Sequence, residues 1–506
     1  MKSNNATVSL WARRMAPLLA AGASALWMLG CAHVTHHVDG VAWTPPSPAA
    51  PWTPPKPPAE KSPAQKSASA GAEAPGEVKK LSLAEAVDIA LQNNPETRIS
   101  WNNARAAAAG YGSALGSLYP DADVSGTAFK SKGQDYQGGT GGYGGSPDQI
   151  LTGYNASASL SLLLFNFGGR LATIEQSRQA LLAADWTHNA VIQSVVLQTE
   201  EAFFNHMMAR ALLEANRTSL AEAEAGLNAA EERNRVGLAT AADVLQARTA
   251  YSEIKLAVLG TEGQVRVSRG GLAAALGLMA NAAFDFELIN PGIPAATVAV
   301  SVDSLIERAL AGRPDLQASR AMSRESAANV RRARSNLLPS LSAMGSFSRN
   351  WIEDVPGFND SRYGALLLQV PIFSGFSRQF GLAAARAEAA AQKERTRAFE
   401  QSVALDVYSS HSNFITAGER LRTTDDLVAS ARQSEEVALG RYKEGVGSIL
   451  DLLSAQKALA MARAEQINAR LGWFTSLARL SHDIGILGPH GDNPLAPASI
   501  SPEDQP

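Results

Sequence analysis

The sequence predicts an α+β membrane protein in which one helix-strand-strand-helix-helix unit occurs twice. Three observations support this fold class: an internal duplication, four short strands of alternating polarity, and two very long helices without proline. A chain of 506 residues has room for two such units. Four strands cannot close a barrel, so we expect three identical chains to share a twelve-stranded β-barrel, with their helices forming a coiled-coil tunnel in the periplasm.

The duplication appears as four pairs of matching segments. The first two pairs are separated by 219 positions and the last two by 208. The matching positions are Pro95 with Pro314, Pro120 with Pro339, Arg170 with Arg378, and 236–247 with 444–455. The offset changes where the first copy carries a Gly-rich insertion, so a single insertion accounts for the difference between the copies.

The first 30 residues have the composition of an export signal peptide. A positive start is followed by the apolar core Met15–Leu29, which is too short to span a membrane. The run WMLGC, which ends at Cys31, resembles a lipoprotein signal, so Cys31 is a predicted lipidation site that would anchor the chain in outer-membrane lipid. An ordinary signal peptide cut nearby is the alternative. Cys31 is the only cysteine, so no internal disulfide can form.

Composition shifts divide the remaining chain into four parts. Residues 31–78 are a proline-rich linker that favours extended polyproline II and would act as a lipid-anchored tether. The two repeats are expected at 79–285 and 286–487. The tail at 488–506 is rich in Pro, Gly and Asp, and we expect it to be disordered.

Each repeat is predicted to begin with a shorter helix and two strands. In the first copy we expect a helix over 81–118, which ends before Pro120 because the residue before proline avoids the helical region. A strand from Asp121, a Gly-rich loop, and a strand at 154–162 with alternating apolar and small polar residues follow. The corresponding strands of the second copy are expected at 340–351 and 362–373.

Two long helices complete the repeats. From 168 to 235 and from 378 to 442 there is no proline, and apolar residues keep helical spacing. A span of roughly 68 residues would be about 100 Å long. Each helix should turn at a glycine, Gly237 or Gly445, and return as a helix of roughly 40 residues. The abundant alanine suits close, coiled-coil packing.

Composition argues against several functions. The net charge of −3 gives no electrostatic basis for binding nucleic acid. The Gly-rich segment lacks the Lys-Ser/Thr of a phosphate-binding loop, and the eight histidines have no zinc spacing. We therefore predict that the protein is not an enzyme and has no catalytic residues, cofactor or metal site.

Several motifs together resemble the TolC-type family of outer-membrane factors, in its lipoprotein branch. They are LSLAEAVDIALQNNP, the Leu-Tyr-Pro and Leu-Leu-Pro strand starts, LFNFGGR and PIFSGFSR, and the turns after Gly237 and Gly445, spread over about 81–486. The resemblance implies a homotrimeric, passive export channel in the outer membrane of a Gram-negative cell. It also implies two partners, a periplasmic adaptor (membrane fusion) protein and an inner-membrane pump of the RND or ABC type.

The cargo stays open at this point. Efflux of small molecules such as drugs or metals is the first hypothesis, and type I secretion of polypeptides is the alternative. A non-conducting periplasmic spacer or stalk is a third possibility, from another class of protein.

The resemblance also assigns roles to the helix tips. Val236, Gly237 and Leu238 match the tripeptide that the family offers to the adaptor, and Gly445 with Val446 holds the equivalent place. An apolar residue beside a glycine lets another helix tip approach closely. The alternative is that these glycines only terminate helices.

Three further residues are predicted to form a pore gate. Asp451 would give a ring of negative charge in a trimer, and Asp243 is its counterpart in the first copy. Tyr442 matches a tyrosine that the family links to the residue at Asp243. The family's linking arginine is replaced by Gly447 and a second ring aspartate by Ser454, so Arg235, Arg441 or Lys443 could substitute; the alternative is that all these are solvated tip charges.

Overall fold

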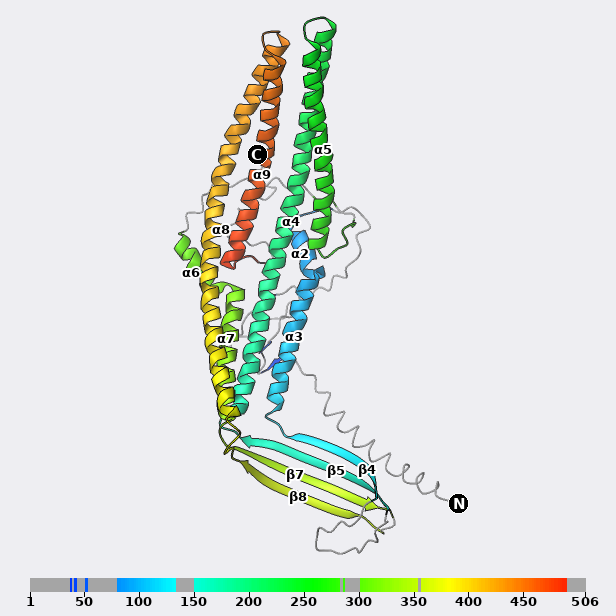
Figure 1. The fold of residues 1–506 in the computed structure, drawn as a ribbon, viewed down its shortest axis with the longest axis vertical. Helices are drawn as coiled ribbons and strands as arrows, with labels where there is room; N and C mark the ends of the chain where they lie inside the picture. Colours follow the sequence, from blue (N-terminus) through cyan, green and yellow to red (C-terminus); the bar gives the residue numbers. More distant parts are fainter. Residues whose placement is uncertain are drawn as a thin grey trace, which may run out of the picture.

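The computed structural model describes residues 37–38, 41–42, 51–52, 80–132, 150–282, 285–286, 301–353 and 356–488. The predicted signal peptide, Cys31, most of the linker and the tail after Gly488 lie outside the described residues. In the described part, long helices stand on a four-stranded sheet that lies at one end of the molecule (Figure 1).

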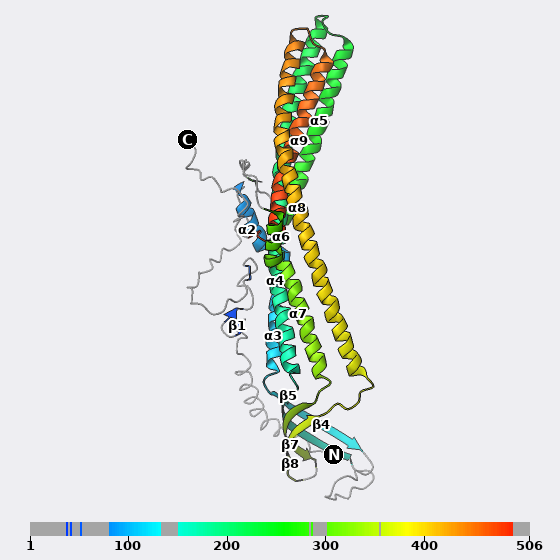
Figure 2. The same cartoon turned by 90° about the vertical axis from the view of Figure 1, so that its left-hand side faces the viewer.

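Two helices run almost the full length of the helical part. α4 (Gly169–Arg235) and α8 (Ser377–Lys443) have 67 residues each, as predicted. α5 (Ala241–Ala275) and α9 (Ile449–Ile484) pack beside them in the half away from the sheet, while α3 (Pro95–Gly116) and α7 (Pro314–Ser335) pack in the half near it (Figures 1 and 2). α2 (Leu83–Asn93) and α6 (Val302–Gly312) lie near the middle. No helix within the described ranges has the length and hydropathy needed to cross a membrane.

The single helix predicted over 81–118 is wrong, because the chain forms two helices there. Asn94 has an extended ψ of 127°, and its side chain accepts a hydrogen bond from the Glu96 amide at 2.9 Å. Pro95 then occupies the first turn of α3. Proline excludes the helical conformation from the residue before it and is well tolerated at a helix start, so Asn94-Pro95 ends one helix and begins the next. Arg313-Pro314 does the same in the second copy.

The main sheet joins the strands of both repeats. It contains β4 (Asp121–Lys132), β5 (Ile150–Phe165), β7 (Ser340–Ile352) and β8 (Asn359–Gln369), all antiparallel in the order β4-β5-β7-β8. β8 ends four residues before the predicted Phe373, where Pro371 cannot donate a ladder hydrogen bond. Two short pairs also form: β1 (His37–Val38) with β2 (Val41–Ala42), and β3 (Lys80–Leu81) with β6 (Asp285–Phe286).

One face of the main sheet carries small polar side chains across all four strands. The register aligns Ser125, Ser157, Ser348 and Ser361 in one row. The hydroxyls of Ser125 and Ser157 lie 2.7 Å apart, and the Asn155 amide donates to Asn350 Oδ1 at 2.5 Å. Leu160 and Leu366 belong to the opposite face and are exposed, at 50% and 71%. The polar and apolar faces therefore extend over both repeats.

The junctions between strands and long helices repeat their contacts. Arg170 donates to the Ser117 carbonyl at 3.4 Å, and Arg378 donates to the Asn336 carbonyl at 3.0 Å. These carbonyls belong to the C-caps of α3 and α7, where a basic side chain satisfies a free acceptor. The arginines that marked the duplication thus connect each long helix to the end of the shorter helix beside it.

The largest hydrophobic core lies halfway along the helices. Side chains of α4, α8 and α9 meet there, including Phe204, which stacks on Phe474 with ring centroids 4.9 Å apart. Two glycines allow the ends of α5 and α9 to enter this junction. A Cβ on Gly277 would lie 2.7 Å from the Asn93 carbonyl carbon, and one on Gly485 would lie 3.0 Å from the Arg313 Cα. The same close approach occurs in both repeats.

Candidate functional site at the helix tips

The two turns farthest from the sheet bring together the residues predicted for docking and gating. Gly237 and Gly445 have φ values of 80° and 78°, a conformation that only glycine adopts readily. Each helix ends in a Schellman turn, which has two backbone bonds. The longer-range bond runs from the Leu238 amide to the Arg233 carbonyl at 2.8 Å in the first tip, and from the Val446 amide to the Arg441 carbonyl at 3.0 Å in the second. Both glycines therefore terminate their helices, one residue after the C-caps Val236 and Glu444.

Exposed apolar side chains lie next to both glycines, on both sides of Gly237 and after Gly445. Val236, Leu238 and Val446 are 64%, 68% and 69% exposed. No internal contact explains such exposure for branched apolar residues at two equivalent turns. A partner that covers them would remove their surface from water, so the tips have the character of a docking surface.

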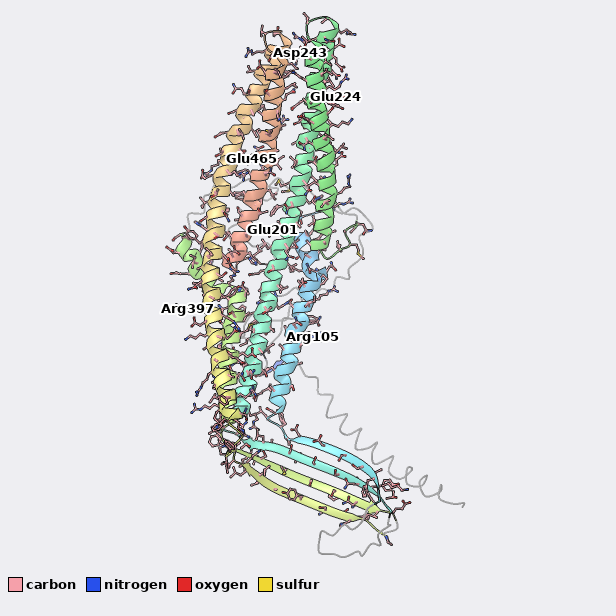
Figure 3. The ribbon with its side chains drawn as sticks, in the orientation of Figure 1. Arg105, Glu201, Glu224, Asp243, Arg397 and Glu465 are labelled. Atoms are coloured by element: carbon pink, nitrogen blue, oxygen red, sulfur yellow. The ribbon has the colours of Figure 1, made fainter. Side chains whose placement is uncertain are left out.

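The two predicted gate aspartates have a local structural role. Asp243 is the third residue of α5, and its carboxylate accepts the Thr240 amide hydrogen at 2.8 Å. Asp451 is the third residue of α9 and forms the equivalent contact with Ser448 at 3.4 Å. Both pairs are capping boxes, which stabilise a helix start. One carboxylate oxygen carries each contact and leaves the other available at the tip end of the molecule, where Figure 3 labels Asp243.

Tyr442 connects the second repeat to the first, through a residue that the sequence did not indicate. It is 4% exposed and packs with Ala230 and Ala247 of the first repeat. The Arg233 guanidinium lies 4.9 Å from its ring centroid and donates to the Tyr442 carbonyl at 2.7 Å. The cation stacks on the ring and also satisfies a carbonyl at the C-terminus of α8.

The expected hydrogen bond between Tyr442 and Asp243 is absent from the described contacts. The Tyr442 hydroxyl has no hydrogen-bond partner within the described residues. Burial raises the pKa of Tyr442; Arg233 lowers it and Asp243 raises it by smaller amounts. Asp243 is thus close enough to act on Tyr442 through its charge, while Arg233 makes the direct contact.

The three basic residues suggested as substitutes make no such link within the part of the chain that the structure describes. Arg235 pairs with Glu232 in its own helix, and Arg441 and Lys443 are exposed. Arg233 could have been considered because Arg441 is its equivalent at an offset of 208, so each repeat carries an arginine at this place. Only the packing of the two hairpins decides which of them reaches the other repeat.

Two more arginines join the hairpins below the tips. Arg463 of α9 holds the Glu222 carboxylate of α4 in a bidentate pair, with both distances 2.9 Å. Arg479 of α9 donates to Glu201 at 2.6 Å, and Figure 3 labels Glu201 near mid-length. Fork-shaped arginine-carboxylate pairs fix relative position well. With Arg233, they connect the first repeat's long helix to the second hairpin at three levels.

The described residues contain no cluster of three His, Cys, Asp or Glu side chains that could hold a metal ion. The site consists of exposed apolar turns, two charged helix starts and an arginine-tyrosine contact. Together with the sheet and the long helices, it fits one class of protein: a component of a membrane channel, with a helical extension that ends in these turns.

Comparison with known proteins identifies the family. The profile of the outer membrane efflux protein family matches residues 86–278 and 305–485, and the chain belongs to this family. Protein CyaE of Bordetella pertussis is 28% identical over 407 residues, covering 76% of this chain and 80% of that protein. The probable efflux pump outer membrane protein TtgC of Pseudomonas putida is 25% identical over 410 residues, covering 80% and 83%.

Solved structures show the same fold. The outer membrane protein VceC of Vibrio cholerae superposes with a TM-score of 0.69 at 20% identity, covering 80% of this chain and 96% of that one. The prediction of a TolC-type fold with a helical tunnel and an outer-membrane location is therefore confirmed. The family consists of channel proteins for efflux.

Proposed function

We propose that three copies of this chain form one continuous export channel, closed by a twelve-stranded barrel in the outer membrane and extended by a helical tunnel. The observation that carries this proposal is the four-stranded antiparallel sheet, whose outer strands β4 and β8 have no neighbour on one side within the described residues. An open strand edge in hydrocarbon leaves backbone groups unsatisfied, at a cost of several kcal/mol each. Copies of the same sheet can satisfy both edges.

The two faces of the sheet support a water-filled interior. The row of serines and the asparagine pair occupy one face, as expected for a lumen, while Leu160 and Leu366 occupy the face suited to lipid. A non-conducting stalk would have no use for a continuous polar face. Strands of 11 to 16 residues are long enough to cross the membrane at a tilt.

The tips support the proposed partners. Exposed Val236, Leu238 and Val446 suit an apolar contact with the end of a periplasmic adaptor, which would connect the channel to an inner-membrane pump of the RND or ABC type. The Pseudomonas putida relative is described as part of an efflux pump, which favours small molecules as cargo over polypeptides. Asp451, Asp243 and Tyr442 form the proposed gate, with Arg233 holding Tyr442.

Single-channel recording tests the proposal. Purified trimer in a planar bilayer should give discrete ohmic steps, with cations passing more readily than anions because Asp451 of the three chains would form the proposed ring of negative charge. A monomer in mild detergent, or a trimer without conductance, would contradict it. If the genes beside this one encode an ABC exporter with a large secreted substrate, polypeptide secretion replaces efflux while the channel itself stands.

A further inference from the structure

A short piece of the N-terminal linker is bound to the side of α4. The Trp52 amide donates to Asn189 Oδ1 at 2.8 Å, and the Asn189 amide donates back to the Trp52 carbonyl at 2.6 Å. The Trp52 ring meets Trp186 edge to face, with centroids 5.5 Å apart. Trp52 is 3% exposed and lies 137 positions from Asn189. This is a two-point backbone clamp, the way that proteins commonly hold an extended peptide.

Two buried groups that can carry a proton lie within four residues of Asn189 on α4. Asp185 and His188, on the same stretch of α4, are both 0% exposed. His188 Nδ1 is 2.8 Å from the Ser100 hydroxyl of α3. Within the described residues, both carboxylate oxygens of Asp185, His188 Nε2 and Trp52 Nε1 have no hydrogen-bond partner. So many unpaired polar atoms in one place are unusual in a folded protein and suggest a functional reason.

We propose that Trp186 and Asn189 form a binding seat for the Trp52 segment of the chain's own tether, and that release of the tether is coupled to loss of a proton from Asp185. The occupant is the segment around Trp52, and its covering of the seat keeps water from the buried acid. This inference concerns the tether and holds whatever cargo the channel carries.

The direction of the coupling follows from burial. Burial raises the pKa of Asp185 from 3.8 to about 9 and lowers the pKa of His188 from 6.5 to about 4. In the seated state Asp185 is protonated and His188 neutral. When the seat opens to water, both groups return toward their ordinary values, so at neutral pH Asp185 gives up its proton.

The two groups act together at lower pH. Between about 4 and 6.5 the seated pair holds one proton on Asp185 and the open pair holds one on His188, so opening changes no proton count. Between about 6.5 and 9 the open state holds one proton fewer. Seating is therefore insensitive to pH in the lower range and weakens as pH rises in the upper range.

Other charges on the packed elements do not disturb this scheme. Burial is the only cause of either shift. The described part of the tether at 51–52 brings no charge. The charged groups on the packed helices include Glu96, Arg98 and Arg105 on α3, Glu175, Arg178 and Glu200 on α4, and Arg320, Arg324 and Glu325 on α7. Of these, Arg105 stacks on Trp101, Arg178 pairs with Glu175, and Arg324 donates to Gln179.

The sequence around Trp52 allows a direct measurement. Between Pro51 and Pro55 only Trp52 and Thr53 have a backbone amide hydrogen, so hydrogen exchange of a peptide from this region reports almost purely on the clamp. Exchange in the full-length trimer, divided by the intrinsic rate at each pH, gives the opening constant. We expect it to be flat from pH 5 to 6.5 and to rise on the order of 30-fold from pH 7 to 9.

Three variants make the test specific. Asp185→Asn keeps the shape of the side chain and should abolish the rise above pH 7, and opening should then increase below about pH 6.5, because His188 alone remains. Asn189→Ala should exchange near the intrinsic rate at every pH. Asp88→Asn, at an exposed position on α2, should behave as the unmodified chain. An opening constant that stays flat from pH 7 to 9, or a rise that persists in Asp185→Asn trimer, overturns the proposal.

Discussion

The two helix tips are built on the same plan, but they differ in the one contact that joins them. Each tip has a glycine with positive φ, a Schellman turn and a capping box closed by an aspartate. Arg233 of the first tip stacks on Tyr442 of the second, whereas Arg441, its equivalent, is exposed. The duplication thus supplies two equal turns, and the packing of the hairpins assigns them different tasks.

The apolar turns test what the tips share, and they should give the largest effect. Leu238→Asp and Val446→Asp each place a charge in the proposed adaptor contact, where an unpaired buried charge costs about 3–5 kcal/mol. We expect either variant to lower adaptor affinity by at least 100-fold. When it is expressed in a strain whose own copy of this gene is deleted, we expect no export. Binding of the adaptor encoded beside this gene, measured by surface plasmon resonance, checks the first effect.

Met279→Asp is the matched control, because Met279 is also an exposed apolar residue, at 79%, but lies in neither tip turn. It should leave adaptor binding unchanged. If Leu238→Asp is harmful and Val446→Asp is silent, the adaptor recognises one tip only, and the equivalence of the turns has no part in docking.

The arginines test what distinguishes the tips. Arg233→Ala removes the stacking contact and the bond to the Tyr442 carbonyl, together worth about 1–3 kcal/mol. We expect the resting conductance of the trimer in bilayers to rise several-fold. Arg441→Ala, at the equivalent place, should leave it unchanged. Equal effects of both substitutions would mean that the arginines act only through general charge at the tips.

The overall order of elements could be predicted because it rests on local signals. Proline positions set the strand starts, alternation identified β5, and the absence of proline gave α4 and α8 to within about two residues, the usual uncertainty of helix ends. The break at Asn94-Pro95 was missed, although the same proline rule applied there. Helical spacing continues on both sides of Pro95, and for that reason the two helices were predicted as one.

The site was less predictable because its contacts cross the repeats. Asp243 and Asp451 were identified from the duplication, but their capping partners Thr240 and Ser448 were overlooked, although Thr-x-x-Asp and Ser-x-x-Asp spacing indicates a helix start. Arg233 and Asn189 had no local signal. Each contacts a residue more than 130 positions away, and no periodicity carries that information.

The aspartates allow a smaller and more selective test. Asp243→Asn and Asp451→Asn keep an oxygen for the capping contact and remove the charge, so the free energy of unfolding should change by less than about 1 kcal/mol in both. Only Asp451→Asn should reduce block by multivalent cations in bilayer recordings, because Asp451 is exposed and Asp243 is partly covered. Unchanged block in Asp451→Asn trimer means that this residue does not form the charged ring.

Tyr442→Phe should have the smallest effect of all, and that makes it a sharp test of how the tips are joined. The Tyr442 hydroxyl is buried without a hydrogen-bond partner in the described residues, while the ring and the carbonyl contact Arg233. Phenylalanine keeps the ring, so resting conductance should stay within about twofold and stability should be equal or slightly greater. A hydroxyl that holds Asp243, as the family resemblance implied, would instead give an open channel comparable to Arg233→Ala.

The pH dependence of the gate gives a second readout for Tyr442. Since burial raises the pKa of Tyr442, its contribution to stability is fully present below the ordinary value of 10.0 and is lost only as pH rises above it. The unmodified gate should therefore be constant through neutral pH and loosen above about pH 10, and Tyr442→Phe should remove that loosening.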